Sequence, residues 1–305
     1  MRGATVRRRR KGSSMTSSIR GIASLPRSIP APAPAGLAQL QRATFLPAAD
    51  NPDYADRLAE FNRLQAAGVD GRDLWEQTGI YASAATGGVP VYEIPDNNAD
   101  FVGGTPPVTG PGYNPMGESF DHPELYAAHP RSADVNLQIT DQTPDSTRRG
   151  YFRPGSLRDA PTVGLSLDEG DMDKTSARSI LLHENQHFVA NETVGMPGGA
   201  DPRTLTDVAQ YLNLNYPDWR NLVPEDRQLT DAQLSTIRMN PDPGLTEDNV
   251  YTYLFSPGEA LARATQSRMD LTADERIPAY PGDSLDVPIE GVEMYLDAYR
   301  ALRNP

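Results

Sequence analysis

The chain of 305 residues contains no cysteine, only four histidines, and no apolar run near the roughly 18 residues that a membrane-spanning helix needs. Without cysteine, a disulfide scaffold, thiol catalysis, an iron–sulfur cluster and a zinc finger are all excluded. A hydrophobic content of 38% with 28 prolines predicts that part of the chain is irregular. Because histidines are so few, their positions become the most informative feature.

The net charge of −13 conceals a division between the N-terminus and the rest of the chain. Residues 1–49 hold nine basic residues and no acidic one, whereas the remainder stands at −22. We predict a disordered arm rich in Arg, Ser and Pro over 1–49, and three interpretations stay open. The first is a plain disordered tail, part of which would be absent if translation starts at Met15 and not at Met1. The second is an arm that contacts DNA through the basic residues 7–11. The third, which we rank last, is an organelle transit peptide. No secretory signal is predicted, because no apolar stretch follows the arginines.

The order of the predicted elements indicates an α+β fold, since strands come first and helices after. Short helices are expected at 52–67 and 70–78, ended by Gly68 and Gly79, and a long loop at 97–122. Strands are expected at 89–94, 135–140, 151–152 and 162–166. The strongest helix begins with Thr175 or Ser176 as its cap and is broken at 195–199. Further helices are expected at 204–214, 230–238, 245–255, 257–269 and 289–303.

The strongest helix contains His183-Glu184-Asn185-Gln186-His187, a match to H-E-x-x-H. Four residues make about one helical turn, so both imidazoles project from one face and can bind one metal ion. Glu184 lies about 100° round the helix, where it can take a proton from a water molecule beside the metal. The pattern predicts a Zn²⁺ site with His183 and His187 as ligands and Glu184 as general base. The alternative is two polar residues on a helix surface.

A third protein ligand must come from elsewhere, and an acidic residue on a later helix is expected. The candidates are Glu192, Asp201, Glu225, Glu247 and Glu259. We favour Glu259, because 256–258 (SPG) predicts a helix start and Arg263, one turn on, can pair with its carboxylate. The alternative for Glu259 is an acid placed favourably in the first turn of a helix.

Tyrosines and the other two histidines complete the candidate residues. Tyr251 and Tyr253 precede Glu259 and can donate a hydrogen bond to a developing oxyanion, and we take Tyr253 as a candidate catalytic residue. The alternative is that both are core aromatics. His122 and His129 each adjoin a proline, so we expect them in turns and not as ligands.

Residues 181–192 (LLHENQHFVANE), followed by Gly195 and 198–199, resemble the L-L-H-E-x-Q-H pattern of zincin-like domains in bacteriophage and mobile-element proteins, often called large polyvalent protein-associated domains. Residues 258–268 are similar to the family's G-E-x-E-A-R-x-x-Q-x-R, and 272–276 to its T-x-x-E-R. Segments at 75–79, 92–94 and 122–125 also resemble what precedes the motif there, so the resemblance covers about 70–280. The chain departs from the pattern at Leu261, where the family has a second glutamate.

The resemblance implies a zincin-like metallopeptidase fold, with a small mixed or antiparallel sheet packed on the H-E-x-x-H helix and a helical C-terminal half. It divides the chain into the arm at 1–49, helices and loops at 50–130, a metal-binding domain at 131–280, and a linker and helix at 281–305. It also implies that 162–166 is the edge strand that receives an extended substrate.

For function, the resemblance implies a phage-encoded, virion-associated zinc peptidase that acts on a peptide or protein. Phage structural proteins are then candidate partners, and the virion or the host cytoplasm is the expected location. The alternative is a weak or inactive zincin-fold structural or injected protein whose arm contacts DNA. Leu261 bears on this choice, because the chain would lack a ligand if the family's second glutamate were one.

Overall fold

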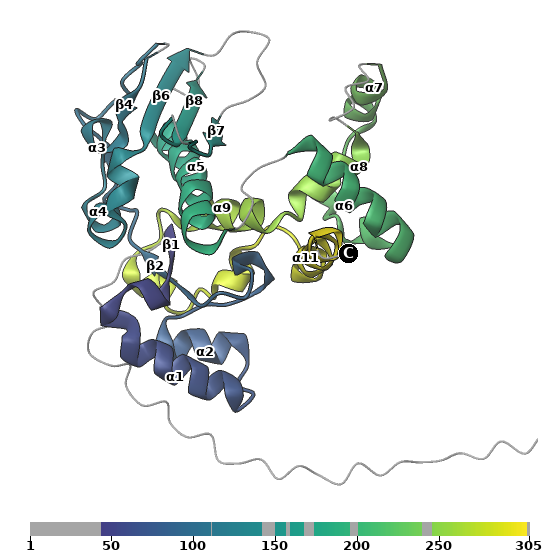
Figure 1. Cartoon of the computed structure of the whole chain (residues 1–305), viewed down its shortest axis with the longest axis horizontal. Coiled ribbons are helices and arrows are strands. Elements are labelled where there is room, and N and C mark those ends of the chain that lie inside the picture. Colours follow the sequence, from purple (N-terminus) through teal and green to yellow (C-terminus); the bar gives the residue numbers. More distant parts are fainter. Residues whose placement is uncertain are drawn as a thin grey trace, which may run out of the picture. The chain divides into compact units, whose positions relative to one another are not determined.

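The computed structural model describes residues 44–110, 112–141, 150–156, 159–167, 174–195, 201–239 and 246–303. All of them belong to one compact unit, Ala35–Pro305. Most of the predicted basic arm, 1–43, lies outside the described residues. The described part is α+β, as predicted (Figure 1).

The main sheet is small and mixed, with the strand order β4-β6-β8-β7. Its strands are β4 (Asn114–Pro115), β6 (Asn136–Asp141), β7 (Gly150–Arg153) and β8 (Thr162–Leu167). β6 and β8 are parallel, whereas β4 and β7 run antiparallel to their neighbours. The prediction that the 162–166 strand lies at the edge was wrong, because β8 pairs on both sides. β7 is the outer strand, because it precedes β8 in the sequence and pairs antiparallel with the side of β8 that faces away from β6.

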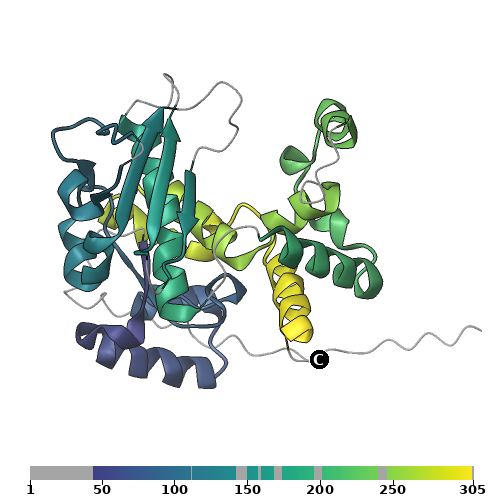
Figure 2. The ribbon, with the colours of Figure 1, turned by 45° about the horizontal axis from the view of Figure 1, so that its top comes forward.

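The helix with the histidine motif, α5 (Lys174–Val194), packs against one face of this sheet (Figure 2). Leu181 and Phe188 are fully buried on it and belong to the same apolar cluster as Val163 and Leu165 of β8. Burial of such side chains contributes about 1.5–3 kcal/mol each. Thr175 and Ser176 lie inside the first turn, so the predicted cap was wrong. The predicted break is confirmed at its first residue, since α5 ends at Val194 and Gly195 has φ +62, whereas 196–199 lie outside the described residues.

A second, two-stranded sheet joins β1 (Thr44–Pro47) to β2 (Val91–Ile94). The buried side chain of Gln186 on α5 fixes β1, because its Oε1 accepts a hydrogen bond from Phe45 N (2.9 Å) and its Nε2 donates to Phe45 O (3.2 Å). The amide thus pairs with the strand as a neighbouring peptide group would. The prediction of disorder up to residue 49 was therefore wrong for β1, which is buried along its length.

A separate apolar cluster joins α6 (Pro202–Asn215), α8 (Glu247–Leu254) and α11 (Ile289–Arg303). Its aromatic members are Trp219, Tyr251, Phe255 and Tyr295. α9 (Pro257–Arg268) contributes Ala260 to this cluster and also packs along α5. The helix that carries Glu259 therefore links the helical cluster to the helix that carries the histidines.

The remaining elements surround these two cores. They are α1 (Ala55–Ala66), α2 (Gly71–Thr78), β3 (Asp100–Phe101), α3 (Met116–Ser119), β5 (Phe120–Asp121), α4 (Pro123–Ala128), α7 (Asp231–Met239) and α10 (Ala273–Arg276). Gly68 and Gly79 follow α1 and α2 with positive φ, as predicted. The expectation of one long loop at 97–122 was wrong, because short strands and α3 lie within it.

The largest apolar cluster takes residues from both sides of the boundary predicted at 130/131, from Leu46 to Met269. That boundary therefore runs through a shared core. The five helices predicted after residue 200 are confirmed, and each of their ends lies within two residues of the predicted position. Among the described residues, no helix combines the length and the apolar character needed to cross a bilayer.

Candidate metal centre

The two histidines of the motif lie one turn apart on α5, and their Nε2 atoms are 3.2 Å apart. Glu259, in the first turn of α9, completes the group: Oε1 lies 3.2 Å from His187 Nε2 and Oε2 lies 3.3 Å from His183 Nε2. His187 and Glu259 are buried, and His183 is partly exposed. The packing of α9 on α5 therefore brings Glu259 to the two histidines, as the sequence analysis predicted for residues on two different helices.

The spacing of these three side chains suits a metal ion. Ligand atoms around a tetrahedral ion with bonds of about 2.0–2.1 Å stand about 3.3–3.4 Å apart, which is the spacing found here. Glu259 Oε2 is buried and accepts no hydrogen bond from any described residue. A buried carboxylate oxygen without a hydrogen-bond donor is costly, and a cation bound between it and the histidine Nε2 atoms would stabilise it. His183, His187 and Glu259 can therefore hold a metal ion.

The electrostatics of Glu259 favour its ionised form. Burial by itself would raise the pKa of this carboxyl, but contacts with His187 and His183 outweigh burial and hold the pKa well below its usual range. A carboxylate that stays ionised is the form that binds a metal.

Glu184, the predicted general base, is buried to 8% exposure next to the histidines. A pocket of about 450 Å³ opens beside it, lined by His183, Glu184, Gly150, Thr175, Ser176, Ser179, Ile180, Gln266 and Met269. Gly150 begins β7 so close to α5 that a Cβ there would stand 2.9 Å from Glu184 Cγ and 2.8 Å from Ile180 Cγ2. The outer strand thus approaches Glu184 closely only because residue 150 is glycine.

Tyr253, on α8, interacts with Glu259. Burial first, and then the charge of Glu259, raises the pKa of Tyr253 above its ordinary value, which already lies well above neutral pH. Tyr251 has a different place: its hydroxyl accepts a hydrogen bond from Leu229 N (3.1 Å) inside the helical cluster. Of the two tyrosines, only Tyr253 interacts with a residue of the metal group within the described part of the chain.

Arg263 and Leu261 are the other two residues of α9 that the sequence analysis singled out. Arg263 pairs with Glu259 at 3.9 Å, as expected, but its closer contacts are with Asp286 (2.8 Å) and Leu254 O (2.6 Å). Leu261 is 2% exposed and packs with Phe45 and other apolar residues, about 200° round α9 from Glu259. The departure from the family pattern at this position therefore removes no ligand in this chain.

The other acidic candidates and the other two histidines lie outside the metal group. Asp201 caps α6, and Glu247 lies in the first turn of α8. His122 is buried against Asp96 (2.7 Å) and caps α4, whereas His129 contacts Ser132 (2.9 Å) just beyond that helix. Both histidines thus lie in loop positions at the two ends of α4, which agrees with the expectation of loop or turn residues.

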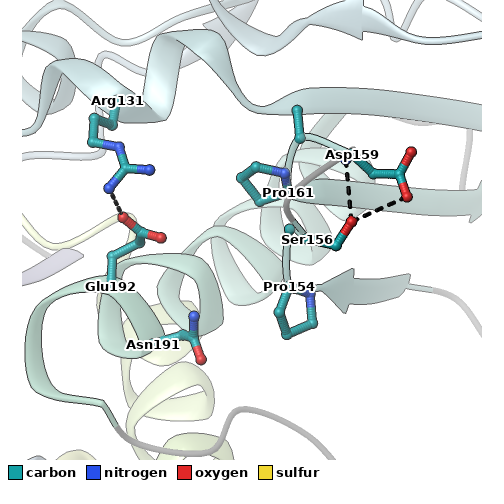
Figure 3. A pocket seen from close by; sticks show the side chains of 9 residues that line it. Arg131, Pro154, Ser156, Asp159, Pro161, Asn191 and Glu192 are labelled. Atoms are coloured by element: carbon teal, nitrogen blue, oxygen red, sulfur yellow. Dashed lines mark hydrogen bonds and ion pairs between the residues drawn. The ribbon is translucent and has the colours of Figure 1, made fainter.

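Glu192 pairs with Arg131 at the edge of a second pocket of about 520 Å³ near the C-terminal end of α5 (Figure 3). Asn191 also lines this pocket, and Ser156 bonds to Asp159 across from it. None of the three metal-group residues lines the pocket. It therefore offers positions on the same helix for control substitutions.

Two glutamines have roles that sequence analysis did not assign. Gln186 holds β1, as described above, and Gln266 on α9 contacts His183. Gln266 follows Glu259 by seven residues, which is two helical turns, so both lie on one face of α9. That spacing was the available signal for Gln266. Nothing local indicates the partner of Gln186, because β1 is far away in the sequence.

Comparisons of the chain with protein-family models, with curated proteins and with solved structures found no match. What the site can do must therefore be argued from its geometry. That geometry comprises a buried metal-binding group, an acid beside it, and a pocket that reaches both.

Proposed function

We propose that the protein is a zinc-dependent peptidase of the zincin type. The observation that carries the proposal is the convergence of His183, His187 and Glu259 beside Glu184 and a pocket. Two imidazoles and one carboxylate, with a further position open, form a ligand set typical of catalytic zinc. When bound there, zinc would polarise a carbonyl and lower the pKa of a water molecule.

In the proposed reaction Glu184 acts as general base and then as general acid. It takes a proton from the attacking water, whose oxygen bonds to the carbonyl carbon of the substrate. It then delivers that proton to the departing amine as the C–N bond breaks, so the products are a carboxylic acid and an amine. Among the described residues β7 is the outer strand of the sheet, so an extended peptide can align along it, and Gly150 brings that strand to Glu184.

Glu184→Gln tests the proposed function. We expect this variant to keep stoichiometric zinc but to cleave a mixed peptide library about 10²–10⁴-fold more slowly, because an amide cannot take the proton. The matched control is Glu192→Gln, the same change on the same helix outside the metal group, which should keep both properties. Cleavage by Glu184→Gln at the rate of the wild type, or the absence of zinc from the wild type, would refute the proposal.

Tyr253→Phe distinguishes two roles for the hydroxyl near Glu259. If the hydroxyl turns to donate to the oxyanion, kcat should fall about 10²–10³-fold with zinc affinity unchanged. We expect this result, because Tyr253 interacts with Glu259 of the metal group and its hydroxyl is a hydrogen-bond donor. A loss of zinc affinity with kcat unchanged at saturating zinc would show instead that the hydroxyl only supports Glu259. Tyr251→Phe, in the helical cluster, is the matched control.

The resemblance to phage domains extends the proposal to a virion-associated protein with phage structural proteins as partners. The alternative, a structural or injected protein whose basic arm contacts DNA, depends on residues 1–43, which lie outside the described part of the chain. It stays a prediction. A DNA mobility shift that is weakened by salt and lost on deletion of residues 1–14 would support it.

A further inference from the structure

Gln266 connects α9 to the first histidine of the metal group. Its Oε1 lies 3.0 Å from Nδ1 of His183. Its Nε2 lies 3.1 Å from the carbonyl oxygen of Ser179 and 3.1 Å from the hydroxyl of the same residue. Ser179 precedes His183 by one turn on α5, so the amide spans two successive turns of that helix.

The contacts of the amide determine its orientation. A backbone carbonyl can only accept a hydrogen bond, so the NH₂ group of Gln266 must face Ser179 and its oxygen must face His183. An amide oxygen also only accepts, so Nδ1 of His183 must carry a proton. In a neutral imidazole the other nitrogen then has a free lone pair. Nε2 of His183, the atom that faces Glu259, is therefore the one ready to bind a metal.

His187 lacks such support. Its Nδ1 is buried and has no hydrogen-bond partner among the described residues. The two ligands from one helix therefore differ, since a side chain fixes the ring and the tautomer of His183 only. This difference makes His187 an internal reference for the role of Gln266.

We propose that Gln266 is a positioning residue that holds His183 as the Nδ1–H tautomer with Nε2 directed at the metal. The inference deepens the proposed function, on whose metal site it rests, but it does not require peptide hydrolysis. Outer hydrogen-bond partners of ligating histidines typically account for a 10–100-fold difference in metal affinity. Because Gln266 and Glu259 share one face of α9, this helix would supply the ligand Glu259 and would also hold the ligand His183 in position.

The test compares Gln266→Leu with wild type in two measurements. Zinc affinity, from competition with a chelator, should fall about 10–100-fold. In the zinc-free protein, ¹⁵N shifts of the imidazoles should show His183 as the Nδ1–H tautomer in wild type and as a tautomer mixture in Gln266→Leu. The chain has only four histidines, so each ring can be assigned from single substitutions.

Two further variants separate positioning from general loosening of the fold. Gln266→Glu keeps an acceptor for Nδ1–H and should restore the Nδ1–H tautomer. Gln186→Leu removes the other glutamine amide on these helices, the one that bonds the backbone of Phe45 in β1. This variant should lower stability while leaving the tautomer of His183 unchanged.

Two outcomes would overturn the inference. One is a Gln266→Leu protein with the zinc affinity of wild type. The other is reduced affinity with the His183 tautomer unchanged, since that result would assign Gln266 a merely structural role. If wild type binds no zinc, the proposed function fails, whereas the tautomer measurement still decides whether Gln266 fixes the ring of His183.

Discussion

His187→Ala is expected to abolish stoichiometric zinc binding and, with it, peptide cleavage. Apparent zinc-binding free energies of about 10–16 kcal/mol for sites with four protein ligands amount to about 2.5–4 kcal/mol per ligand. Loss of one ligand should therefore weaken zinc binding about 10²–10³-fold. His187 is the more informative of the two histidines, because it is buried, whereas His183 is partly exposed.

Zinc content after dialysis and the thermal midpoint with added zinc measure this effect. A ligand that binds only the folded state raises its stability by RT ln(1 + [L]/Kd), so zinc should raise the midpoint of wild type far more than that of His187→Ala. His129→Ala is the matched control, since His129 packs on Phe188 of the same helix but lies outside the metal group. Equal zinc content in wild type and His187→Ala would exclude the proposed centre.

How much of this site could be predicted depends on how local its determinants are. The helix, the one-turn spacing of His183 and His187, and the helix start before Glu259 are features of a few neighbouring residues. Whether Glu259 meets the histidines depends on how α9 packs on α5, and the sequence offered five acidic candidates. The place of Leu261 was equally undecided, because only the packing of α9 determines which of its faces meets the core.

The strands depend even more on contacts between residues far apart in the sequence, which local patterns do not predict. β1 is only four residues long, too short for an alternating pattern, and it is held by Gln186 at a separation of 141 residues. The edge position expected for β8 came from the resemblance alone, because the pattern of a strand says nothing about the number of its neighbours. The short β7 takes the outer position and brings Gly150 to Glu184. Register and strand order depend on such long-range pairing, which periodicity does not encode.

The position of α9 thus determines much of the site, and a buried ion pair fixes its C-terminal end. Arg268, the last residue of α9, donates to Glu93 of β2 through Nε (2.5 Å) and Nη2 (3.0 Å). Both side chains are fully buried, and Arg268 also donates to Ala279 O and Ser284 Oγ. The same helix carries Glu259 and Gln266, so the anchoring of α9 bears on both.

Arg268→Met is therefore expected to lower the free energy of unfolding by about 3–5 kcal/mol, because it removes the guanidinium that neutralises a buried carboxylate. Chemical denaturation of the zinc-free protein measures this change without a contribution from metal binding. Arg63→Met is the matched control, since Arg63 forms an exposed pair with Glu60 whose loss should leave the free energy of unfolding almost unchanged.

A second substitution tests the physical reason for that loss. The double variant Arg268→Met with Glu93→Leu replaces both charges by apolar groups, so most of the stability should return. If the double variant is as unstable as Arg268→Met alone, the destabilisation comes from lost packing or from the contacts with Ala279 and Ser284, and not from the buried charge. If Arg268→Met is as stable as wild type, the ion pair does not anchor α9, and another contact must hold Glu259 beside the histidines.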